Sequence, residues 1–320
     1  MRVCLDGCPQ QVSRGPRVLS EAASWPVGLT LHKGSLKAHG KEHAVSILYV
    51  VATPIGNLED ITERAKRILS EVDLIAAEDT RHTAKLLAHL NIRTSLTAYH
   101  DHNESRASRS LIDMIKNGKA VALVSDAGTP LIADPGYRLV KLAREEGVKV
   151  VPVPGPSALI AALCVAGLPS DRFTYYGFLP VKPKALEDFL TAQKNETGTL
   201  VFYESPHRVV KTIEMFERVF GADRTLVVAR ELTKTFEQVS FATIGETRQR
   251  IEAGEITVKG EFVLLLQGQQ KIESNWDERE LMTVLLSELP IGKAAEIASR
   301  LTGGAKKALY KVAVSIKKGD

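Results

Sequence analysis

Small and acidic residues are concentrated in one loop of the chain, within the stretch LVSDAGTPLIADPG at residues 123–136. The residues with the least side chain stand at its centre: Ala127, Gly128 and Thr129. Their uncovered backbone lets a flat ligand approach closely. The loop has no lysine or arginine, which disfavours phosphate, whereas Asp126 and Asp134 could face a positive charge. The loop therefore favours a neutral nucleoside or a cationic ligand, although a structural turn capped by aspartate would have a similar composition.

Comparable loops follow most of the other apolar runs. They read ATPIGN at 52–57, EDTRH at 78–82, YHDHNE at 99–104, PGPSA at 154–158, ESPHR at 204–208, ARELTK at 229–234 and KGEF at 259–262. None of them contains a P-loop or a Rossmann dinucleotide fingerprint. Glycine, proline and acid at so many strand ends exceed what turns alone require, so we interpret these loops as parts of one ligand site.

Strands and helices alternate in the first half of the chain and position these loops. Continuous apolar runs rich in β-branched residues predict buried strands at 47–52, 73–80, 95–100, 120–126 and 148–153. Helices are expected between them, at 58–72, 82–90, 104–118 and 136–147. This alternation predicts an α/β domain over residues 47–169 with a doubly wound parallel sheet, whose ligands bind beyond the carboxyl ends of the strands.

The second half is richer in strands and ends in helices. Strands are predicted at 173–179, 198–205, 224–231, 236–243 and 260–268, with fewer helices between them. They indicate a second α/β domain with a mixed sheet over residues 170–270. Residues 271–320 are helical and basic, and Thr302-Gly-Gly-Ala-Lys is interpreted as a break between two helices of a C-terminal appendage.

Residues 1–46 lack periodicity, which predicts a disordered extension or an upstream start in the gene model. Four residues there could in principle hold zinc: Cys4, Cys8, His39 and His43. The long gap between the two pairs does not match a compact finger, so we expect no metal site. Three cysteines make a poor disulfide framework, which favours a reducing compartment. Cys164 lies in an apolar helix and is expected to be a core residue.

Taken together, the motifs resemble the tetrapyrrole methylase superfamily, and within it the branch that methylates ribosomal RNA. In family order over residues 48–267, the matching motifs are LYVVATPIGNLEDIT, AEDTR, HDHNE, LVSDAGTPLIADPG, VPVPGPSA, FYESPHR and ARELTK. Tetrapyrrole-modifying relatives carry a Gly-rich first loop with aspartate, so TPIGNLEDIT favours the RNA branch. TGGAKKALY resembles the helical appendage of that branch, whereas residues 1–46 fall outside the family pattern.

The resemblance implies a cofactor, a reaction and a partner. The cofactor would be S-adenosyl-L-methionine, in a cleft between the two α/β domains and with backbone contacts from Gly128 and Thr129. The implied cofactor residues are Pro54, Ser125, Asp126, Ala127, Gly128, Thr129, Pro130, Ser157, Ser205 and His207. The implied reaction methylates the 2′-hydroxyl of a cytidine in the decoding centre of 16S ribosomal RNA, either free or in the small ribosomal subunit. The family also implies a cytoplasmic homodimer, and no apolar run is long enough to span a membrane.

Methyl transfer to a ribose hydroxyl needs alignment of the reacting atoms and a proton acceptor. Glu78, Asp79 and Arg81 follow a predicted strand, where a base and a phosphate clamp could both act. We predict Asp79 or Glu78 as the base; the alternative is that these acids cap the next helix and pair with Arg81. His100 and His102 have no fixed third ligand and are interpreted as a polar loop.

The charge distribution predicts where RNA binds. The net charge is +4, and residues 293–320 carry seven Lys or Arg against two acids, beside a body that is acidic overall. Because an acidic body repels RNA, the tail is predicted to grip it. The candidate RNA-binding residues are Arg230, Lys234, Lys306, Lys307 and Lys311, with Ala308, Leu309 and Val312 expected to face the protein.

Other readings stay open at the level of sequence. Arg230 and Lys234 are equally compatible with edge-strand charges, and the tail with a lid whose apolar face is Leu281, Val284, Leu285 and Leu289. Two further function classes are a methylase of a tetrapyrrole or protein side chain, and a non-catalytic RNA-binding module on the same fold.

Overall fold

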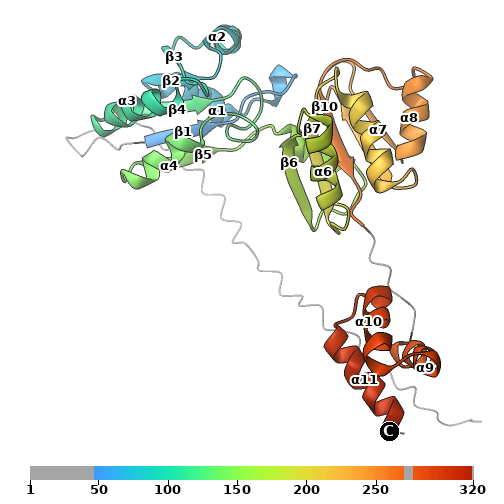
Figure 1. The fold of residues 1–320 in the computed structure, drawn as a ribbon. Helices are drawn as coiled ribbons and strands as arrows, with labels where there is room; N and C mark the ends of the chain where they lie inside the picture. The colour runs from blue at the N-terminus through green and yellow to red at the C-terminus, as the bar shows by residue number, and fades with distance from the viewer. Residues whose placement is uncertain (1–46, 270–276, 319–320) are drawn as a thin grey trace, which may run out of the picture. The chain divides into compact units, whose positions relative to one another are not determined.

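The computed structural model describes residues 47–269 and 277–318. The predictions for residues 1–46, including the candidate zinc ligands, lie outside these residues. Two five-stranded sheets and a group of C-terminal helices make up the described chain (Figure 1).

The first sheet is parallel throughout, as its unbroken apolar strands predict. Its order is β3-β2-β4-β1-β5, and the strands are β1 (Ile47–Val51), β2 (Leu74–Ala77), β3 (Leu96–Ala98), β4 (Ala120–Val124) and β5 (Lys149–Val153). Pro152, which lacks an N–H donor, stands on the edge strand β5, where it is tolerated. The chain runs from β1 outward to β2 and β3, then returns to β4 and crosses to β5. The strand order therefore reverses between β4 and β1, which is where such sheets bind ligands.

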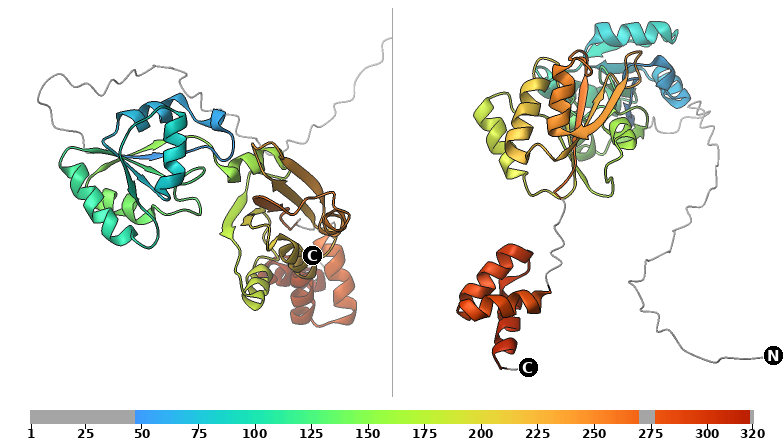
Figure 2. Two further views of the ribbon diagram at one scale, coloured as in Figure 1. Left: turned by 90° about the horizontal axis from the view of Figure 1, so that it is seen from above. Right: turned by 90° about the vertical axis from the view of Figure 1, so that its right-hand side faces the viewer.

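Helices cover both faces of this sheet (Figure 2). They are α1 (Glu63–Glu71), α2 (Thr80–His89), α3 (Glu104–Lys116) and α4 (Tyr137–Glu145), with a 3₁₀ turn η1 (Leu58–Asp60) before α1. Side chains alternate along the strands, so Tyr49 and Val51 pack with α1 and α2, whereas Leu48 packs with α3 and α4. The first predicted α/β fold is thus confirmed.

The second sheet is mixed, also as predicted. Its order is β6-β7-β10-β8-β9, with only the β6–β7 pair parallel. The strands are β6 (Phe173–Phe178), β7 (Thr199–Glu204), β8 (Thr225–Arg230), β9 (Gln238–Thr243) and β10 (Phe262–Leu266). Three helices pack on one face: α6 (Pro183–Ala192), α7 (Val209–Phe220) and α8 (Ile244–Glu252).

Helix α5 (Ala158–Val165) packs on the other face of the second sheet. Leu159, Ala162 and Leu163 point into that core. Cys164, however, is exposed, and its neighbour Val165 is 54% exposed. The expectation of a core cysteine is therefore wrong, because only one side of this uniformly apolar helix meets the sheet.

The C-terminal residues form three helices around a small core of their own. The helices are α9 (Glu278–Glu288), α10 (Ile291–Thr302) and α11 (Lys306–Lys318), and Gly303 ends α10 in a left-handed conformation with φ 70°. Leu309 is buried with Leu281, and Val312 packs against the same core, as predicted for α11. Ala308, however, is exposed and Ala313 is buried instead, which corrects that one position. Val284 is 63% exposed, so it is not part of the apolar face proposed for a lid. Among the described residues, no helix is both long and apolar enough to cross a membrane.

Candidate active site

A pocket of about 360 Å³ opens among the strand-end loops of both sheets. Its size lies within the range of small-molecule sites. From the first sheet come the loops after β1, β2 and β4, and from the second the ends of β6 and β7 and the start of β10. Six of the loops that the sequence indicated as one site therefore line this pocket, whereas the loops at 99–104 and 229–234 contribute no residue to it.

The loop after β4 is held in an unusual conformation. Gly128 forms an isolated β-bridge with Thr53. The Thr53 N–H donates to the Gly128 carbonyl, with an N···O distance of 2.8 Å, and the Gly128 N–H donates to the Thr53 carbonyl, with an N···O distance of 3.0 Å. Gly128 has φ +84°, and further along Leu131 and Ala133 also adopt positive φ, 74° and 68°. Such left-handed residues are costly without glycine and cluster at ligand sites. The bridge has a further consequence: the N–H of Gly128 donates to Thr53, so what this glycine presents to the pocket is its bare Cα.

Two carboxyl groups in the pocket, Asp134 and Glu78, have raised pKa values. Burial, together with repulsion from Glu78, raises the pKa of Asp134 to about 7. Burial also raises the pKa of Glu78. Neither group forms an ion pair within the described residues. The other acids that line the pocket have partners within the protein: Asp126 accepts the N–H of Asp79, Glu204 pairs with Arg208, and Glu261 pairs with Lys234.

Asp79 has a different role from Glu78. Its carboxylate caps α2 by accepting the Arg81 N–H at 2.8 Å, and it also pairs with the Arg81 guanidinium at 2.7 Å. These hydrogen bonds hold the pKa of Asp79 well below its usual range. A carboxylate of such low pKa is a weak base, and neither Asp79 nor Arg81 lines the pocket. The alternative interpretation, a helix cap paired with an arginine, therefore describes Asp79 and Arg81. Glu78, in contrast, lines the pocket.

The predicted cofactor residues divide into two groups. Those that line the pocket are Asp126, Ala127, Gly128, Thr129, Ser157 and Ser205, and those that do not are Pro54, Ser125, Pro130 and His207. The buried Ser125 lies beneath the loop, where its carbonyl accepts the Thr53 hydroxyl. His207 lines a separate groove together with residues of α6 and α7.

Sequence reasoning missed the apolar wall of the pocket. This wall consists of Ile55, Ile132, Ala158, Phe178, Tyr203, Phe262 and Val263. Tyr203 also fixes the start of α5, because its hydroxyl accepts the Leu159 N–H at 3.0 Å. In the sequence these residues are indistinguishable from core residues. The available signal was their position: Ile55, Ile132, Ala158 and Phe262 stand within the strand-end motifs, and the other three stand near them.

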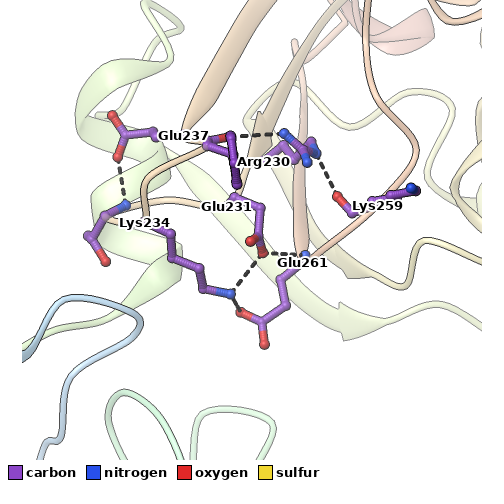
Figure 3. Close-up of polar contacts among 8 residues, drawn as sticks. Arg230, Glu231, Lys234, Glu237, Lys259 and Glu261 are labelled. Atoms are coloured by element: carbon purple, nitrogen blue, oxygen red, sulfur yellow. Dashed lines mark hydrogen bonds and ion pairs between the residues drawn. The ribbon is translucent and has the colours of Figure 1, made fainter. Parts of the chain in front are cut away.

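Arg230 and Lys234 are engaged in contacts within the protein (Figure 3). The buried Arg230 donates to the carbonyls of Lys259 and Phe236. The Lys234 ammonium pairs with Glu231 at 2.8 Å and Glu261 at 3.0 Å, and its stem lies where a Cβ on Gly56 would otherwise be. Both cations thus hold loops beside the pocket through these contacts.

Comparison with known proteins agrees with this architecture. Residues 47–248 match the tetrapyrrole (corrin/porphyrin) methylases, and residues 274–317 match the RsmI C-terminal HTH domain. The chain belongs to the tetrapyrrole methylase family. It is 51% identical to ribosomal RNA small subunit methyltransferase I of Escherichia coli O157:H7, over 83% of this chain and 94% of that protein. The protein of the same name from Haemophilus influenzae is 48% identical, over 82% and 95%.

Solved structures support the fold independently. A diphthine synthase matches with a TM-score of 0.53 at 16% identity, covering 69% of this chain and 90% of that one. The cobalt precorrin-4 methyltransferase CbiF matches with a TM-score of 0.52 at 18% identity, covering 73% and 98%. At such identities the likeness concerns the fold alone. The family membership makes this chain a methyltransferase that uses S-adenosyl-L-methionine.

The pocket fits that cofactor. Its wall is largely apolar, Gly128 leaves room along one side, and Glu78 and Asp134 supply carboxyl groups that pair with no cation of residues 47–269 or 277–318. A ligand with a positive sulfonium centre and an apolar body has the matching chemistry.

Proposed function

We propose that this chain methylates the 2′-hydroxyl of a cytidine in the decoding centre of 16S ribosomal RNA. The observation that carries the proposal is the match over nearly the whole length of relatives named as small-subunit rRNA methyltransferases, including the C-terminal HTH domain. Such a substrate places the work of the enzyme in the cytoplasm. We also propose the division into domains at 47–169, 170–270 and 271–320.

In this proposal the pocket residues hold the cofactor and receive a proton. Ala127, Gly128 and Thr129 flank the adenosyl-methionine, and the carboxylates face its positive centre. S-Adenosyl-L-methionine supplies the methyl group, and the cytidine hydroxyl must lose its proton as it attacks. We assign the proton acceptor to Asp134, whose pKa of about 7 suits a base at neutral pH, and assign to Glu78 the role of keeping that pKa high.

The direct test is transfer of labelled methyl from S-adenosyl-L-methionine. Small ribosomal subunits lacking the modification should accept label at one cytidine 2′-oxygen, and uroporphyrinogen should accept none. Labelled uroporphyrinogen, or no label in either substrate, would contradict the proposal.

RNA affinity is expected to depend on the C-terminal helices. Lys306, Lys307 and Lys311 are exposed on α11, and Lys306 pairs only loosely with Glu296, at 3.4 Å. Replacing all three by alanine should weaken binding to small subunits and lower the salt slope of log affinity by roughly 2 units, since each phosphate contact contributes about 0.7 to 0.9. Deletion of residues 275–320 should weaken binding further while leaving cofactor affinity intact. If the salt slope of the triple variant equals that of the parent, these three lysines do not contact RNA phosphates.

We further propose that the chain is a homodimer, assembled through an apolar surface beside α5. Val239 and Phe241 of β9 pair with Ala229 and Val227, so they share the sheet face on which α5 packs. Phe241 is nevertheless 56% exposed, and Val165 of α5, the helix that packs on this face, is 54% exposed. Apolar residues grouped in this way mark interaction surfaces.

Phe241→Glu is expected to convert the dimer to a monomer, because a charge would have to be buried at the interface. Light scattering reports the mass in solution. Tyr137→Glu, at an aromatic residue of α4 that is 67% exposed, is the matched control and should leave the mass unchanged. A monomeric parent protein would refute the assembly.

A further inference from the structure

A second depression lies beside the active-site pocket, next to the segments 178–180 and 206–207. It has a volume of about 520 Å³ and lies between the segment after β6 and the helices α6 and α7. Its apolar lining includes Pro180, Val181, Leu186 and Met215. Its polar lining holds three cations, Arg208, Lys211 and Arg218, and the imidazole of His207, against the single carboxylate of Glu214.

This groove adjoins the active-site pocket through two short segments. Phe178 and Pro206 line the pocket, whereas Pro180 and His207, two residues and one residue further along, line the groove. Arg208 fixes the partition between them, because its guanidinium donates to the carbonyls of Leu179 at 2.8 Å and Pro180 at 3.2 Å. A chain that leaves the pocket past this partition enters the groove directly.

The cations of the groove differ in how far they are already engaged. Arg208 pairs with the buried Glu204 at 3.3 Å, and Arg218 pairs with Glu187 at 3.4 Å. Within the described residues, His207 and Lys211 have no carboxylate partner, and both side chains are exposed. They remain available to an anionic ligand, unlike Arg230 and Lys234 on the other side of the pocket.

We propose that this groove binds the sugar-phosphate backbone of the RNA next to the methylated nucleotide, with His207 and Lys211 contacting phosphates. The inference rests on the proposed rRNA substrate and adds where that substrate runs. Extended RNA is recognised by cations that follow its backbone, with apolar surface for the bases. The groove offers both features immediately beside the pocket.

The test combines charge changes of opposite sign. Lys211→Ala and His207→Ala should each weaken binding to small subunits about threefold to tenfold, and Lys211→Ala should also lower the salt slope by roughly 0.7 to 0.9. Glu214→Gln removes the opposing charge, so it should tighten binding. Lys194→Ala removes a lysine just past the far end of α6, about 15 Å along that helix from Pro183, and should have no effect. Cofactor affinity should stay unchanged in all four variants.

Several outcomes would overturn the groove assignment. One is binding by Lys211→Ala and His207→Ala that matches the parent in affinity and slope; another is a weakening with Glu214→Gln. If binding to intact subunits falls but binding to naked 16S RNA does not, the occupant is a ribosomal protein rather than RNA. Failure of the proposed function is distinct, because then the parent chain itself would not methylate small subunits.

Discussion

Asp134→Asn is expected to lower the rate of methyl transfer to small ribosomal subunits by about two to four decades, the usual contribution of a positioned general base. The amide keeps the shape of the carboxyl but cannot accept the proton. Single-turnover measurements at saturating cofactor and RNA isolate this step from binding. Glu78→Gln should have a smaller effect of about tenfold, because burial, the larger cause of the raised pKa of Asp134, is kept and only the added repulsion from Glu78 is removed.

Asp79→Asn is the matched control for this pair of substitutions. Asparagine still caps a helix, so α2 should remain intact, and only the ion pair with Arg81 is lost. Turnover within about threefold of the parent is expected. If Asp79→Asn lowers the rate by decades and Asp134→Asn does not, the assignment of the base is wrong.

The pH dependence of cofactor binding provides a second test of the raised pKa of Asp134. The positive sulfonium favours ionised Asp134, so binding must release a proton wherever that carboxyl is protonated in the free enzyme. Since its pKa is about 7, affinity for S-adenosyl-L-methionine should rise about tenfold from pH 6 to pH 8 and then level off. S-Adenosylhomocysteine lacks the sulfonium charge and should show a shallower rise. Calorimetric titration with either ligand should find no such rise in Asp134→Asn.

Stability provides the check that the variant folds. The pKa of Asp134 is higher in the folded chain than its ordinary value of 3.8, so the folded state holds this proton more tightly. Its contribution to stability is complete below about pH 4 and is lost as the pH rises through 7. At pH 8 the parent has lost this stability because its buried Asp134 is ionised, whereas the amide in Asp134→Asn stays neutral. The melting temperature of the variant should therefore be at least that of the parent.

The strands and their loops could be predicted because their signals are local. A run such as Ile47–Val51 is apolar at every position because helices bury both faces of its sheet. Once strands alternate with helices, the carboxyl ends of parallel strands meet at one edge. The grouping of Gly128, Glu78 and Ser205 around one pocket follows from that rule and from the family resemblance.

The direction of individual side chains could not be predicted, because it depends on distant partners. Leu131 and Ala133 adopt left-handed conformations, which sequence analysis expects only at glycine. The loop that contains them brings Asp134 into the pocket. The sequence flagged Asp134 only as a possible neighbour of a positive charge. The sequence likewise gave no sign that the Arg230 guanidinium donates to the carbonyls of Phe236, six residues away, and Lys259, 29 residues away.

Helix faces were misjudged for a related reason. In α5 every residue is apolar, so nothing in the sequence distinguishes buried Leu163 from exposed Cys164. In α11 the predictions for Leu309 and Val312 are confirmed and only Ala308 is wrong, because Ala308 and Ala313 are alike in sequence and only the packing of α9 and α10 selects between them.

Gly128→Val is expected to weaken binding of S-adenosyl-L-methionine about 10- to 100-fold while the protein stays folded. Overfilling a packed site costs about 1 to 3 kcal/mol, and about 1.4 kcal/mol corresponds to tenfold in affinity. A Cβ at this position already lies 3.3 Å from the side chain of Ile55, so the larger isopropyl group must project into the pocket. Calorimetric titration measures the affinity, and circular dichroism reports the fold.

Backbone strain alone could also disturb this loop, and two further variants separate it from occlusion. Gly147 has φ +72° and no atom within 4 Å of an added Cβ, so Gly147→Val carries a similar conformational cost of about 1 to 2 kcal/mol without touching the pocket. It should melt earlier than the parent but bind the cofactor normally. Gly128→Ala adds the strain with little bulk and should fall between the parent and Gly128→Val. Equal affinity in the folded Gly128→Val variant and the parent would mean that the cofactor does not lie along this loop, because a β-branched side chain cannot share the space that the bare Cα leaves.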